Sequence, residues 1–133
     1  MWGSKGSGDG QFDDPAAVAV DPGTNKVYVA DPRNSRIQVF DSDGKFLTKW
    51  LIPEWGGKPY GFEDLVMDSA AGRLYASSTN VNAVSIFDLN GNRVGSLTPK
   101  PPDQLEGPSS LALIDRKLYV LSMFGNHVSV IDL

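Results

Sequence analysis

Few side chains in this sequence have the chemistry that catalysis or metal binding requires. The chain has one histidine, His127, and no cysteine among its 133 residues. Without cysteine there can be no disulfide, thiolate nucleophile or cysteine-ligated metal cluster. A single histidine does not build a histidine-rich metal site or a Ser/His/Asp triad within one chain, so we expect His127 to be structural or solvating. These residue types favour binding over catalysis.

Carboxylates are the remaining candidates for metal ligands. The segments Asp41-Ser42-Asp43-Gly44 and Asp88-Leu89-Asn90-Gly91 superficially resemble calcium-binding loops. Both lack the ladder of further ligands and the closing glutamate, so they fit hairpin turns better. The sequence therefore predicts no metal site and no cofactor.

The elements that position these residues repeat along the chain. Tyr28, Tyr75 and Tyr119 occupy equivalent positions in three similar segments, at spacings of 47 and 44 residues. Repeats of this length are typical of stacked supersecondary units. Within each unit, apolar residues alternate in short runs such as Ile37-Gln38-Val39, which predicts β-strands.

Turn residues separate these runs and define the expected strands. Asp43-Gly44 and Asn90-Gly91 each lie between two apolar runs and predict type I′ hairpin turns. The third of the three sequence repeats has no fourth apolar run. We predict eleven strands, at 16–20, 26–31, 36–41, 45–50, 63–67, 73–77, 83–88, 92–97, 110–113, 117–121 and 127–132.

Antiparallel units of four strands are typical of β-propeller blades. The segments 15–21, 27–31 and 34–41 resemble an NHL repeat, and residues 2–12 resemble the linker between two NHL blades. The resemblance covers essentially the whole chain and is most specific in the first unit. In the second and third repeats, the position of Asp31 is occupied by Ser78 and Ser122. The position of Arg36 is occupied by Ala83 and His127.

The resemblance implies an all-β fold of about three four-stranded antiparallel propeller blades. Residues 1–133 would form one NHL-like segment, with blades at about 11–50, 58–97 and 104–133 and no outer strand in the last. The resemblance implies that this segment would be half of a six-bladed NHL-type propeller. Because an open arc exposes apolar blade faces, the remaining blades would come either from a longer parent chain or from a second copy.

The net charge and the hydropathy of the chain limit the kinds of partner that it can bind. The net charge is −4, which disfavours nucleic acid and anionic membrane surfaces. The sequence contains no signal-peptide pattern and no apolar run near the roughly 20 residues of a spanning helix, and it assigns no compartment. We expect a protein partner.

Loop residues supply the candidate binding surface. Arg33, Asn34 and Arg36 form a small basic cluster beside Asp31, for which salt bridging between blades is the favoured interpretation. Aromatic and basic residues also lie in loops that we expect on the same face as Arg33: Trp55, Lys58, Tyr60 and Phe124. Aromatic residues in such loops either contact a partner or cap the core between blades, and both alternatives remain open.

The sequence thus favours a non-catalytic protein-interaction scaffold, completed into a ring by self-association or by further blades. A first alternative is a fragment of a propeller lyase or hydrolase with an axial divalent metal. Its ligands would come from acids near the starts of the blades: Asp13, Asp14, Glu54, Glu63, Asp64 and Glu106. A second alternative is a platform for single-stranded RNA, which the acidic net charge disfavours.

Overall fold

The computed structural model describes residues 1–57 and 62–133. These residues form two compact units, Met1–Gly61 and Phe62–Leu133, which are treated separately below. Antiparallel strands dominate both units, and the predicted all-β class is confirmed. All eleven predicted strands are present, with boundaries within two residues of those predicted from the sequence.

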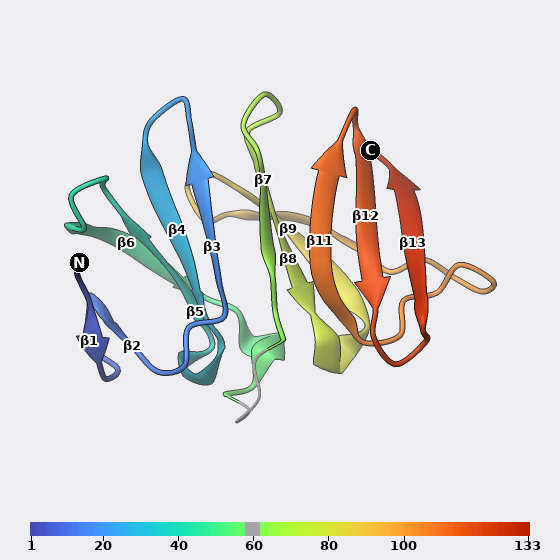
Figure 1. Ribbon diagram of the computed structural model, residues 1–133, viewed down its shortest axis with the longest axis horizontal. Coiled ribbons are helices and arrows are strands. Elements are labelled where there is room, and N and C mark those ends of the chain that lie inside the picture. Colours follow the sequence, from blue (N-terminus) through green and yellow to red (C-terminus); the bar gives the residue numbers. More distant parts are fainter. Residues whose placement is uncertain (58–61) are drawn as a thin grey trace. The chain divides into compact units, whose positions relative to one another are not determined.

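The first unit contains one four-stranded antiparallel sheet, here called blade 1 (Figure 1). Its strands lie in chain order and alternate buried with exposed residues most clearly in the first strand. They are β3 (Ala17–Asp21), β4 (Lys26–Asp31), β5 (Arg36–Phe40) and β6 (Phe46–Leu51). Two 3-10 turns, η1 (Pro32–Asn34) and η2 (Pro53–Trp55), follow β4 and β6.

A short strand pair at the N-terminus was not predicted from the sequence. β1 (Ser4–Lys5) and β2 (Gln11–Phe12) pair in parallel. The intervening glycine-rich loop is closed by hydrogen bonds from the Gly6 amide to the Phe12 carbonyl (2.9 Å) and from the Gln11 amide to the Gly8 carbonyl (3.1 Å). Such a pair has too few residues to show the alternation that identifies a strand.

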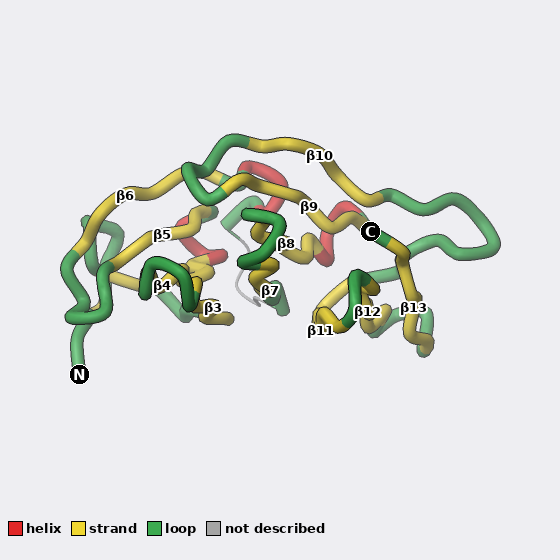
Figure 2. The backbone as a smooth tube through the Cα atoms, turned by 90° about the horizontal axis from the view of Figure 1, so that it is seen from above, coloured by secondary structure: helices red, strands yellow, loops and turns green. Residues whose placement is uncertain are grey.

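The second unit contains two stacked sheets. Blade 2 consists of β7 (Leu65–Asp68), β8 (Arg73–Ser78), β9 (Ala83–Asp88) and β10 (Arg93–Leu97), with the 3-10 turn η3 (Thr79–Val81) after β8. Blade 3 consists of β11 (Pro108–Ile114), β12 (Lys117–Ser122) and β13 (His127–Asp132). Figure 2 follows blade 2 in chain order from β7 to β10.

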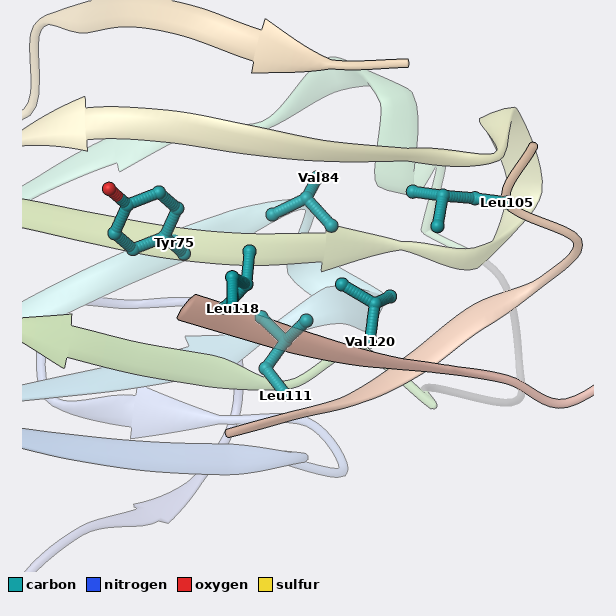
Figure 3. Close-up of a cluster of buried hydrophobic side chains, with 6 residues drawn as sticks. All are labelled: Tyr75, Val84, Leu105, Leu111, Leu118 and Val120. Atoms are coloured by element: carbon teal, nitrogen blue, oxygen red, sulfur yellow. The ribbon is translucent and has the colours of Figure 1, made fainter. Parts of the chain in front are cut away.

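The core of the second unit lies between blades 2 and 3. Tyr75 and Val84 of blade 2 face Leu111, Leu118 and Val120 of blade 3, and Leu105 from the connecting loop closes one end (Figure 3). Alternation along each strand places these side chains on the facing sides of the two sheets. Removing them from water stabilises the stacking of the two blades.

The two hairpins lie where the sequence predicts them, but their turn type differs from the prediction. A type I′ turn needs positive φ at both central residues, whereas here φ is positive at Gly44 (+87°) and Gly91 (+90°) and not at the residues before them. The Asp41 carboxylate accepts the amides of Asp43 (3.0 Å) and Lys45 (2.9 Å). The aspartate therefore stabilises a wider loop in which glycine alone is left-handed, and the type I′ prediction is wrong.

Candidate interaction surface

Arg33 lies in η1, the turn that joins β4 to β5. Pro32 begins this turn, and Ser35 ends it in the left-handed conformation. The guanidinium Nη1 of Arg33 lies 2.7 Å from the Asp14 carboxylate, and its Nε lies 3.7 Å from that of Asp13. The hydrogen bond to Asp14 raises the pKa of Arg33 above its ordinary value. Arg33 therefore offers a partner a cation flanked by two acids.

Asn34 is held by its amide nitrogen. This group donates to the Asp31 carboxylate at 2.9 Å and to the Gly6 carbonyl at 3.1 Å. The two bonds tie η1 to the N-terminal loop. Asn34 thus helps to position the surface around Arg33.

Arg36 forms its ion pair within one blade, and the predicted salt bridge between blades is wrong. Its Nε lies 3.0 Å from the Asp31 carboxylate, on the neighbouring strand and directly opposite in register. Its two terminal nitrogens donate to three backbone carbonyls of the N-terminal loop, those of Ser7 (2.8 Å), Gly8 (3.0 Å) and Gln11 (2.8 Å). Because Arg36 is buried and its guanidinium makes four hydrogen bonds, it is a structural residue.

Trp55 is a core residue, so of the two alternatives left open for it the contact with a partner is wrong and it is removed from the candidate binding surface. It lies in η2 with only 1 % of its surface exposed. A hydrogen bond from the Ile52 amide to the Ser35 carbonyl (2.7 Å) joins η2 to the end of η1. Large aromatic side chains contribute most to the stability of a fold when they are buried, and Trp55 is buried in this way. The other two candidates from this region, Lys58 and Tyr60, lie outside the described residues.

Phe124 is an exposed aromatic residue in the loop between β12 and β13. Its side chain is 67 % exposed. Its amide donates to the Glu106 carbonyl at 3.1 Å, which holds the loop against the chain that precedes β11. A methyl group placed on Gly107 would collide with the Phe124 ring. Glycine therefore lets the ring lie against the backbone while its other face meets solvent.

His127 and Glu63 are two further titratable residues among the candidates. The His127 Nδ1 lies 3.2 Å from the Gly125 carbonyl. Glu63, near the start of β7, is only 4 % exposed, and its Oε2 has no hydrogen-bond partner among the described residues. Burial raises the pKa of Glu63. Within residues 1–57 and 62–133 no group of three or more His, Asp or Glu side chains is arranged to hold a metal ion.

Comparison with known proteins identifies the segment that contains Asp31, Arg33 and Arg36. A family profile for the NHL repeat matches residues 12–40. This segment is therefore similar to an NHL repeat. Protein lin-41 of Caenorhabditis elegans is 46 % identical over 48 residues, covering 36 % of this chain and 4 % of lin-41. Protein brain tumor of Drosophila melanogaster is 47 % identical over 45 residues, covering 34 % of this chain and 4 % of that protein.

An enzyme is also among the relatives of similar sequence. Peptidyl-glycine alpha-amidating monooxygenase of Mus musculus is 44 % identical over 55 residues, covering 41 % of this chain and 6 % of the enzyme. The chain therefore spans only about 4 to 6 % of the length of these relatives. The predicted resemblance to NHL-repeat proteins is confirmed for the segment 12–40.

Solved structures share the fold at low sequence identity. Virginiamycin B lyase from Staphylococcus aureus superposes with a TM-score of 0.63 at 18 % identity, covering 90 % of this chain and 41 % of the lyase. A putative 6-phosphogluconolactonase from Bacteroides fragilis superposes with a TM-score of 0.70 at 16 % identity, covering 89 % of this chain and 34 % of that protein. These likenesses support the propeller-like fold. Among the described residues, no helix has the length and apolar character needed to cross a membrane.

Proposed function

We propose that this chain is a non-catalytic scaffold that binds proteins through the loops of its NHL-type blades, and that it also self-associates. Phe124 is the observation that carries the proposal. It is a large aromatic side chain, 67 % exposed, in a loop fixed by a backbone hydrogen bond. A fixed and exposed aromatic ring loses little entropy on binding, and such residues are enriched at the energetic centres of protein interfaces.

The surroundings of the acidic side chains support a non-catalytic role. Asp14 pairs with Arg33, and Asp31 pairs with Arg36. One oxygen of Asp64 accepts the Leu111 amide at 2.9 Å. These carboxylates are used to hold the fold together. The related monooxygenase segment and the similar lyase fold therefore suggest a shared scaffold more than a shared activity.

Variants of the chain test this proposal. Wild type, Phe124→Ala, Arg33→Glu and the control Val94→Ala are immobilised, and captured proteins are compared by quantitative mass spectrometry. Val94 is also an exposed apolar residue, but it lies on the outer strand β10. We expect Phe124→Ala to weaken binding of a purified partner by about tenfold or more, because it removes an aromatic anchor. Arg33→Glu should chiefly slow association and change its salt dependence.

The proposal fails if no captured protein distinguishes Phe124→Ala from Val94→Ala. A true partner should be retained by Val94→Ala at wild-type level, since that side chain belongs to β10 and not to the Phe124 loop. Circular dichroism on all variants shows whether the fold is intact, so that lost binding is not lost folding.

A further inference from the structure

Two blade faces carry exposed apolar side chains. On blade 1, Val18 and Val20 of β3 are 62 % and 50 % exposed. On blade 3, Val128 and Val130 of β13 are 56 % and 53 % exposed. Isolated exposed apolar residues are normal, but alternate residues on one strand form a contiguous apolar stripe.

The interface between blades 2 and 3 shows what covers such faces. There, Val84 of β9 belongs to the same buried cluster as Leu111 and Leu118 of blade 3, and Ile86 of β9 packs against this cluster. Val84 has no exposed surface and Leu111 has 8 %. This interface lies wholly within the second unit and provides a template for how one blade of this chain receives the next.

The internal repeat maps both exposed faces onto this template. Tyr119 pairs with Val130 as Tyr75 pairs with Ile86, so Val128 and Val130 stand where Val84 and Ile86 stand. Val18 pairs with Val29 as Leu111 pairs with Val120, so Val18 stands where Leu111 stands. The exposed face of blade 3 is thus equivalent to the face that blade 2 presents in the interface between blades 2 and 3. The exposed face of blade 1 is equivalent to the face that blade 3 presents in that interface.

A polar contact of the template has the same equivalents. The Gly107 amide donates to the Asn82 side-chain oxygen at 2.7 Å. Asn126 follows β12 as Asn82 follows β8, and both are left-handed, with φ of +56° and +52°. Asp14 precedes Pro15 as Gly107 precedes Pro108, and both again have positive φ, +51° and +66°. The backbone of each blade is therefore shaped for the same contact.

We infer that the face of blade 3 bearing Val128 and Val130 binds the face of blade 1 bearing Val18 and Val20 in a second copy of this chain. The contact is head to tail, with Asn126 of one copy accepting the amide of Asp14 of the other. This inference rests on the proposed self-association and specifies the surfaces that perform it. A head-to-tail contact closes into a ring when its rotation allows.

Two charge substitutions test the faces separately. Val18→Asp disables blade 1, Val130→Asp disables blade 3, and Val94→Asp is the control on an exposed strand outside both faces. Mass is measured by sedimentation over a wide range of concentration. We expect wild type and Val94→Asp to self-associate and each face variant to weaken association by at least about tenfold, because an unpaired carboxylate would be buried. Val18→Thr and Val130→Thr are milder substitutions that keep the shape of the side chain. They are measured as well, so that a loss of association can be distinguished from misfolding.

Mixing the two face variants tests the head-to-tail arrangement. Val18→Asp keeps an intact blade 3 and Val130→Asp keeps an intact blade 1, so their mixture should form a one-to-one complex that neither forms alone. If Val18→Asp alone associates like wild type while Val130→Asp does not, blade 3 pairs with itself and the inference is wrong.

The remaining outcomes separate this inference from the proposed function. A wild-type chain that stays monomeric overturns both the inference and the proposed self-association. A wild type that associates, with both face variants unaffected, overturns only the choice of faces. Neither result bears on binding at Phe124, which is measured separately with Phe124→Ala.

Discussion

The buried pair of Asp31 and Arg36 explains a substitution pattern among the three blades. Ser78 lies opposite Ala83, and Ser122 lies opposite His127, in the register that joins Asp31 to Arg36. The Ser122 hydroxyl accepts the Glu106 amide at 3.2 Å, as the Asp31 carboxylate accepts the Asp13 amide at 2.9 Å. Serine thus keeps the backbone hydrogen bond in blade 3, while the negative charge and its arginine are lost together.

This pairing predicts that removing only the cation is worse than removing both charges. Arg36→Ala leaves Asp31 buried with its charge uncompensated, at a cost of about 3 to 5 kcal/mol. Asp31→Ser/Arg36→Ala removes the same anchors of the N-terminal loop but leaves no buried charge. Urea denaturation followed by tryptophan fluorescence should find the double variant more stable than the single one. Equal stability would show that the loop anchors, not the charge, dominate.

The buried carboxyl of Glu63 predicts a pH-dependent effect. Burial raises its pKa above the ordinary value of 4.5, so the folded state binds this proton more tightly than the unfolded state does. Stability is therefore lost as pH rises from the unfolded pKa through the raised folded one. Glu63→Gln removes this loss and should raise the melting temperature at pH 7, with little gain near pH 4. A gain that is the same at both pH values would rule out ionisation as its cause.

At the level of elements, alternation along the chain sufficed to place the strands. β4, β9 and β13 begin and end at the residues predicted from the sequence. Turn type was less accessible, since Asp-Gly fits both a type I′ turn and a wider loop. The Asp41 carboxylate favours the wider loop through two backbone amides, and that preference depends on side-chain geometry.

The candidate site was predicted less well than the strands, because loops show no periodicity. Trp55 follows a proline in a short turn, and nothing in that local sequence distinguishes an exposed tryptophan from one that is 1 % exposed. Arg36 was recognised as a salt-bridging residue, but its partner was placed on another blade. The strand register needed to identify Asp31 becomes certain only when the hairpin between β4 and β5 is seen.

At the scale of the whole molecule, the chain consists of two compact units, and its tryptophans report on one of them. Trp2, Trp50 and Trp55 all lie in the first unit, whereas the cluster around Leu118 lies in the second. Tryptophan fluorescence therefore follows the first unit, and far-ultraviolet circular dichroism follows the strands of both. The two signals together can show whether the units unfold independently.

Leu118→Ala uses this separation. The side chain is fully buried between blades 2 and 3, so its truncation should destabilise the second unit by about 2 to 5 kcal/mol. We expect the circular dichroism midpoint in urea to fall more than the tryptophan midpoint, because the substituted core belongs to the other unit. Leu47→Ala, at an exposed position on β6, is the control and should shift neither midpoint appreciably. If Leu118→Ala lowers both midpoints equally, the two units unfold as one cooperative structure.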